Sequence, residues 1–235
     1  MEYFTQAIVL GSTASREYDR LVSLYTHHLG KITAVARGAR RLNSKMAGHL
    51  EPFAVVAVKL VSGRDRYTIS NVEGVERYQD IVHDLSLMRL ARSCLRLVDD
   101  IVHEGACDIS ILDGLRETLA AINHPTMALA TKQWLVNIFG LRLVAHLGYR
   151  PQVTSCVICQ RGISRAKAQF DVLRGGLRCS ACTGPATELV LPLSAQSVEL
   201  LAGVVHSQNS QPGDSAARGE VMAAISALVR SVRGK

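Results

Sequence analysis

Residues 30–51 read GKITAVARGARRLNSKMAGHLE, and this stretch determines how we interpret the rest of the chain. Ile32, Ala34 and Ala36 alternate with Thr33 and Val35, a period of two that is typical of a β-strand with one buried face. The pattern breaks at a glycine, Gly38, after which the sequence becomes polar. A strand that runs into a polar, basic segment is therefore expected here.

The same stretch is strongly basic. No acidic residue lies between Asp19 and Glu51. Five cations fall inside the stretch: Lys31, Arg37, Arg40, Arg41 and Lys45. A field of one sign at a strand end and its following loop suits a polyanion such as nucleic acid. The alternative is a solvated loop that only keeps a small domain soluble.

The surrounding residues 1–80 also have β character. We expect five short strands at Phe4–Leu10, Arg20–Thr26, Lys31–Arg37, Phe53–Val61 and Tyr67–Val72. Five short strands fit a small closed barrel, for which the oligonucleotide-binding (OB) fold is preferred and an SH3-like barrel is the alternative. The aromatic residues in this segment would either stack on bases or pack in the core: Tyr18, Tyr25, Phe53 and Tyr67.

The middle of the chain changes to a helical period. Apolar residues three and four apart predict three helices, which we expect to form a bundle: from His83 to about Gly105, Ser110–Ile122 and Thr126–Leu147. Cys94 and Cys107 lie in this region without metal-ligand spacing, so we expect both to be buried as small hydrophobic residues. Two further helices are expected near Ser194–His206 and Glu220–Val232.

Two C-x2-C pairs form the most specific local motif. Cys156 and Cys159 are followed after nineteen residues by Cys179 and Cys182. This spacing predicts one structural zinc ion held by four thiolates. The segment between the pairs is basic, which makes these residues a possible second DNA-binding surface: Arg161, Arg165, Lys167, Arg174 and Arg178. The alternative is a solvated loop that offsets the thiolate charge.

Overall composition limits the function. The net charge of +7 and the sequence pI of about 9.3 favour nucleic acid or another anionic surface as partner. The sequence contains no phosphate-binding P-loop, no nucleophile elbow and no dinucleotide-binding turn, so we expect no enzyme. A missing signal peptide and membrane span predict a soluble, intracellular protein. The alternatives are a zinc-ribbon RNA-binding or ribosome-associated factor, a metal-dependent nuclease and a protein–protein adaptor.

Three segments together resemble RecO, the bacterial recombination-mediator family. They are the run from Ala7 to Arg41 with Ser44 and Leu50–Phe53, the pentapeptide Leu147–Pro151, and the first C-x2-C pair. The similarity covers roughly residues 3–182. One departure is Gly11–Ser15, where the family more often has basic residues.

The resemblance implies both an architecture and a function. The implied parts are an OB-fold at 1–80, a helical domain at 81–150 and a zinc module at 151–188. Beyond the resemblance, the amphipathic pattern of the last residues predicts C-terminal helices at 189–235 that pack on the helical domain. The implied function is a DNA repair and recombination mediator that binds single- and double-stranded DNA, anneals complementary strands and helps load RecA. Its implied partners are RecR and the C-terminal tail of single-stranded-DNA-binding protein, and its implied location is the cytoplasm, in association with the nucleoid. Arg16 and Arg20 join the five cations of residues 30–51 as expected DNA-binding residues.

Overall fold

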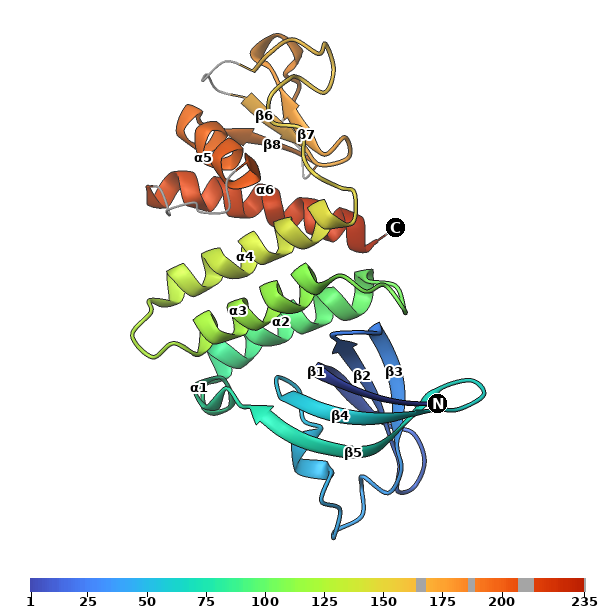
Figure 1. Cartoon of the computed structure of the whole chain (residues 1–235). Helices are drawn as coiled ribbons and strands as arrows, with labels where there is room; N and C mark the ends of the chain where they lie inside the picture. Colours follow the sequence, from blue (N-terminus) through green and yellow to red (C-terminus); the bar gives the residue numbers. More distant parts are fainter. Residues whose placement is uncertain (164–167, 186–188, 207–213, 235) are drawn as a thin grey trace. The chain divides into compact units, whose positions relative to one another are not determined.

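The computed structural model describes residues 1–163, 168–185, 189–206 and 214–234, and it is a mixed α+β protein (Figure 1), which confirms the predicted class. The chain divides into two compact units, Met1–Met127 and Ala128–Lys235. The division falls inside residues 81–150, which the sequence suggested as one helical domain. Each unit is described separately below.

The first unit contains a five-stranded sheet that closes on itself. Its strands are β1 (Glu2–Ala14), β2 (Arg20–Thr26), β3 (Gly30–Ala36), β4 (Val55–Ser62) and β5 (Tyr67–Glu76). They pair in the order β1-β2-β3-β5-β4, and β4 pairs back to β1. Every pair is antiparallel except β3 with β5. The five strands predicted from the sequence are thus all present.

The inside of the barrel is filled by the apolar face of each strand. On β3, Ile32, Ala34 and Ala36 are buried in the core, whereas Thr33 and Val35 lie on the outer face. The residues predicted to share a face therefore do so. Each large aliphatic side chain that is buried in this way contributes about 1.5–3 kcal/mol.

One short helix lies between β3 and β4, and three helices follow β5. They are η1 (Ala47–His49), α1 (Gln79–His83), α2 (Leu85–Ile101) and α3 (Ile109–Asn123). Asp84 caps the start of α2 by accepting hydrogen bonds from the backbone N–H groups of Ser86 and Leu87 at 2.7 and 3.1 Å. Cys94 on α2 is buried as predicted, but the prediction for Cys107 is wrong because that thiol is exposed in the loop before α3.

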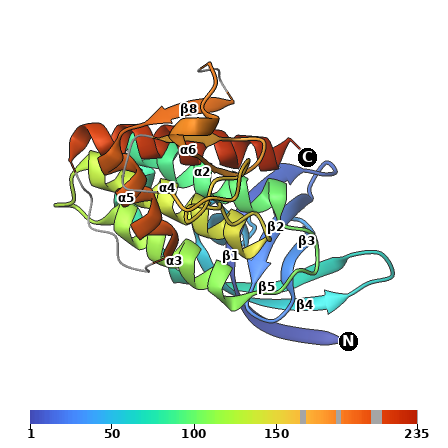
Figure 2. The same ribbon diagram turned by 90° about the horizontal axis from the view of Figure 1, so that it is seen from above.

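The second unit combines three helices with a small sheet. Its helices are α4 (Leu129–His146), α5 (Ala195–His206), α6 (Ser215–Arg233) and the short η2 (Ser180–Cys182). Its strands β6 (Ala168–Asp171), β7 (Gly176–Arg178) and β8 (Val190–Leu193) form a sheet in the order β7-β6-β8. Helix α6 runs beside α4 and α5 (Figures 1 and 2). Among the described residues, no helix is both long and apolar enough to cross a membrane.

Candidate nucleic-acid interface and metal centre

Two loops meet at one end of the barrel, on the side away from α2 and α3 (Figure 1). They are the loop between β1 and β2 and the segment after β3. The backbone N–H of Gly38 donates to the carboxylate of Asp19 at 2.9 Å, and the backbone N–H of Arg40 donates to the carbonyl of Tyr18 at 2.9 Å. The guanidinium of Arg40 also donates to the carbonyl of Arg16 at 3.2 Å. Basic residues from two separate parts of the sequence therefore share one surface.

We call this surface the rim, and it consists of Arg16, Arg37, Arg40, Arg41 and Lys45. All five side chains are exposed. None of them forms an ion pair with an acidic side chain in the part of the chain that the structure describes. The described residues therefore do not neutralise the positive charge of the rim.

One aromatic ring accompanies the rim. The guanidinium of Arg41 lies 5.3 Å from the centre of the Tyr18 ring, and 46% of Tyr18 is exposed. Of the other rings singled out in the sequence, Tyr25 and Phe53 are buried, and Tyr67 packs edge-on against the Tyr3 ring. Tyr18 is thus the one of the four that presents an open face beside the cations.

Two of the predicted DNA-binding cations are used inside the protein. The ammonium of Lys31 lies 3.4 Å from the Asp99 carboxylate and donates to the backbone carbonyls of Asp99 and Val102. Its side chain is only 13% exposed. Arg20 pairs with Glu51 at 2.8 Å. The structure therefore separates Lys31 and Arg20 from the five unpaired cations of the rim.

The outer face of β2 and β3 is partly covered by the end of α2 and the following loop. Ser23 donates to the Asp99 carboxylate at 2.6 Å, Tyr25 donates to the carbonyl of Asp108 at 3.0 Å, and Thr33 donates to the carboxylate of Glu104. This face is consequently less available to a ligand near Gly30 than near Ala36, where the rim begins.

Sequence reasoning missed two further cations next to this face. A cleft of about 720 Å³ lies between β3 and the β4–β5 hairpin, and Arg64 and Arg66 from that hairpin line it. Both arginines are exposed and neither is paired with a described acidic residue. The turn Gly63-Arg-Asp-Arg between two predicted strands was the available signal.

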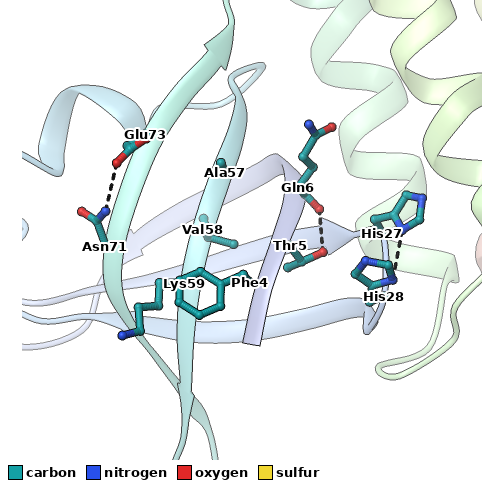
Figure 3. Close-up of a pocket in the computed structure, with 10 residues that line it drawn as sticks. All are labelled: Phe4, Thr5, Gln6, His27, His28, Ala57, Val58, Lys59, Asn71 and Glu73. Atoms are coloured by element: carbon teal, nitrogen blue, oxygen red, sulfur yellow. Dashed lines mark hydrogen bonds between the residues drawn. The ribbon is translucent and has the colours of Figure 1, made fainter. Parts of the chain in front are cut away.

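A second cleft, of about 590 Å³, lies on the outer face of β1, β4 and β5 (Figure 3). Ala57 and Phe4 are among the residues that line it, and 69% of Phe4 is exposed. The ammonium of Lys59 lies 5.2 Å from the centre of the Phe4 ring and 2.9 Å from the carboxylate of Glu2. None of the residues predicted to bind DNA lines this cleft.

The four predicted metal ligands come together in the second unit. The sulfur atoms of Cys156, Cys159, Cys179 and Cys182 all lie within 4.8 Å of one another. The backbone N–H groups of Ile158 and Cys179 each donate to the Cys156 sulfur at 3.4 Å. Four sulfur donors around one point, with N–H groups directed at a sulfur, fit a thiophilic metal ion.

The acidity of these thiols fits the same interpretation. Burial raises the pKa of Cys156, but backbone N–H groups outweigh it and bring this pKa to about 6. For Cys182, a hydrogen bond with the Cys159 thiol and burial raise the pKa to about 12. The first thiolate therefore forms easily, whereas the last does not form beside its neighbours without a compensating cation.

The basic residues around the cysteines have different surroundings. Arg174 and Arg178 both bind the carboxylate of buried Asp171, at 3.1 and 2.8 Å. These bonds hold the pKa of Asp171 below its usual range, although burial alone would raise it. Arg161 is exposed, and Arg165 and Lys167 lie outside the described residues. The possible second DNA-binding surface is thus reduced to Arg161 among the residues described.

Comparison with known proteins gives consistent matches along the chain. Residues 1–78 match the family model "Recombination protein O N terminal", and residues 82–231 match "Recombination protein O C terminal". A protein of Roseiflexus sp. (strain RS-1) named "DNA repair protein RecO" is 34% identical over 199 residues, which cover 85% of this chain and 68% of the relative. A protein of the same name from Alkaliphilus metalliredigens is 31% identical over 180 residues, 77% of this chain and 72% of the relative.

Proposed function

The chain belongs to the RecO family, and from this premise we propose that it is a DNA repair protein that binds single- and double-stranded DNA and anneals complementary strands. The observation that carries the proposal is the rim, with its five unpaired cations on one surface. A cationic surface reduces the repulsion between two polyanions, and base pairing then proceeds downhill. Annealing of this kind requires no catalytic group, so we propose no enzymatic activity.

We propose that the barrel is an OB-fold. The closed strand order β1-β2-β3-β5-β4 supports this assignment. OB-folds bind oligonucleotides on the face of strands 2 and 3 and on the loops that follow strands 1 and 4. Because the loop that contains Glu104 covers part of that face here, we place the DNA at the rim. Arg64 and Arg66 of the β4–β5 hairpin line a cleft together with Lys31 and Glu104, at the other end of β3, so we do not assign them to the same strand.

Tyr18 has a separate role in the proposal. Phosphate contacts hold a strand without reading or stacking its bases, whereas an aromatic ring stacks on a base of any sequence. The exposed ring of Tyr18, supported on one side by Arg41, meets this requirement. We therefore propose that single strands bind with phosphates on the rim cations and one base on Tyr18.

The four-cysteine cluster has a structural role in this proposal. We propose that it binds one zinc ion, since four thiolates saturate a tetrahedral ion and leave no open position for chemistry. Arg174 and Arg178 are engaged by Asp171, so we do not assign them to DNA. The metal would stabilise the second unit directly, because binding energy at such a site is also folding energy.

The remaining proposals rest on family membership. We propose that the protein acts in the cytoplasm during recombination, that it binds RecR and the tail of single-stranded-DNA-binding protein, and that it helps RecA load on coated strands. These partners define the setting in which annealing would occur.

Annealing of complementary oligonucleotides without ATP tests the proposal. The native chain should accelerate annealing, and the R37E/R40E/R41E variant should lose this acceleration because three rim charges are reversed. The matched control R37K/R40K/R41K keeps the charges and should retain most of the activity. Annealing that survives charge reversal contradicts the proposal. Tighter binding to RNA than to DNA of the same sequence would favour an RNA-binding factor instead, and shortened products with magnesium would indicate a nuclease.

A further inference from the structure

Helix α2 carries a row of three arginines on its outer side. Arg89, Arg92 and Arg96 are spaced by three and four residues, which places them on consecutive turns of one helix face. All three are exposed, and their side chains form no hydrogen bond or ion pair with any residue that the structure describes. The charge composition of the sequence does not reveal this row, because residues 81–149 are nearly neutral overall.

The row does not help the helix to fold. Like charges three or four residues apart repel each other and weaken a helix. No acidic residue lies three or four positions from Arg89 or Arg92. Asp99 and Asp100 lie three and four positions beyond Arg96, but Asp99 is engaged by Ser23 and Lys31 of the barrel, and the structure gives Arg96 no ion pair with either of them. Packing is supplied by the opposite face of the helix, so Arg89 and Arg92 have no structural use that explains their cost.

We propose that Arg89, Arg92 and Arg96 bind the sugar–phosphate backbone of a second DNA strand while the rim holds the first. This inference rests on the proposed function, because annealing brings two strands together. The row extends over about 10 Å, from seven residues at 1.5 Å each. Arginine suits phosphate better than lysine does, since its planar group donates two parallel hydrogen bonds.

The separation of the two surfaces allows both strands to be bound at once. Lys31 near the start of β3 contacts the end of α2, whereas the rim begins after Ala36 at the other end of the strand. Seven residues of β3 span roughly 20 Å. This exceeds the Debye length of about 8 Å at physiological salt, so two bound strands would repel each other only weakly.

Nucleic acid fits the row better than an acidic peptide does. A peptide in a specific interface is usually anchored by apolar side chains as well as by charge. Between Arg89 and Arg96, the only other exposed side chain is that of Ser93. The one large apolar side chain that α2 exposes is that of Leu85, one turn before Arg89, so apolar contact is confined to the start of the helix. This part of the helix therefore offers a polar, sequence-independent surface, which is what a phosphate backbone requires.

The number of strands bound per chain tests the inference directly. Two thymidine oligonucleotides of equal length, which cannot pair with each other, would carry different fluorescent labels and be mixed with the full chain. The native chain should bind two strands, and R89Q/R92Q/R96Q should bind one. At 0.1 M salt each phosphate contact is worth about fivefold, so the second-strand affinity should fall by about 100-fold. The variant R89K/R92K/R96K keeps the charges and should still bind two strands.

The outcomes separate this inference from the proposed function. If the native chain binds one strand, the second site is refuted and the rim is unaffected. If it binds none, both fail. If the glutamine variant still binds two strands, the assignment of the second strand to α2 is overturned. If that variant binds two strands but no longer binds a polyglutamate peptide, the arginine row is a site for acidic peptides, and the inference is overturned as well. Helix content measured by circular dichroism should be unchanged in the glutamine variant, because the substitution removes only repulsion.

Discussion

Lys31 and Arg37 lie six residues apart in the same basic stretch, and the structure predicts opposite consequences for removing them. Lys31 connects the barrel to the end of α2 through Asp99 and the carbonyl of Val102 at 3.1 Å. Arg37 is exposed on the rim and pairs with no acidic residue among those described. Replacing each by alanine removes one positive charge, so the two variants are matched controls for each other.

The two substitutions should affect different properties: Lys31→Ala the stability of the protein, and Arg37→Ala the salt dependence of DNA binding. Lys31→Ala removes the cation from Asp99, which keeps its hydrogen bond from Ser23, and leaves two backbone carbonyls without their donor. This should cost about 1–2 kcal/mol of stability, since Asp99 is 38% exposed and water compensates in part. Arg37→Ala should change stability by less than about 0.5 kcal/mol. For single-stranded DNA, five rim contacts predict a log–log salt slope of about −3.5, from −0.7 for each. The slope should become about −2.8 in Arg37→Ala and stay unchanged in Lys31→Ala.

Two measurements are needed. Fluorescence anisotropy with labelled oligonucleotide between 50 and 300 mM salt gives the log–log salt slope of binding. The oligonucleotide is kept at a trace concentration, so that binding is measured at the surface with more phosphate contacts, the rim. Hydrogen exchange of peptides covering β3 gives the local stability. A shallower slope in Lys31→Ala, or an unchanged slope in Arg37→Ala, would show that the unpaired rim cations are not the phosphate contacts.

Three further predictions concern other parts of the chain. Cys179→Ser should lower bound zinc from about one ion per chain toward zero, as measured by elemental analysis, and should destabilise the second unit. The pKa of Asp171 in the folded protein lies below its unfolded value of about 3.9. The carboxylate therefore stabilises the fold above about pH 3.9, and this stabilisation is lost as the pH falls from about 3.9 through the folded-state pKa. Asp171→Asn should show a weaker loss of stability between pH 6 and pH 3 than the native chain does. Gly30→Ala should cost about 2 kcal/mol or more, because Gly30 has φ of +63° and an added methyl would overlap the carbonyl of Ala106.

Each of these has a matched control. Cys107→Ser changes an exposed thiol outside the cluster and should leave the zinc content unchanged; unchanged zinc in Cys179→Ser would refute the four-thiolate site. Gly148 also has a positive φ but open space around it, so Gly148→Ala should cost less than Gly30→Ala. Equal pH dependence in the native chain and Asp171→Asn would show that Asp171 is not responsible for the acid sensitivity.

Local pattern was sufficient for much of the fold. The alternation of Ile32, Ala34 and Ala36 predicted a strand with one buried face because neighbouring side chains in a strand point to opposite sides. The two C-x2-C pairs predicted a metal cluster because each pair is a short local turn. The three strands of the second unit were not predicted, since strands of three or four residues are too short to show a period.

The sequence by itself determined the five strands and the two longer helices of the barrel unit, the clustering of four cysteines and the presence of a basic stretch. Only the tertiary structure decided which cations of that stretch remain unpaired. Lys31 is neutralised by Asp99, 68 residues away, and Arg174 and Arg178 by a buried Asp171, whereas α2 leaves three arginines unpaired in a region of nearly neutral composition. The reason is physical: periodicity follows from the geometry of one chain segment, but the charge on a surface depends on which groups distant segments bring within a few ångströms.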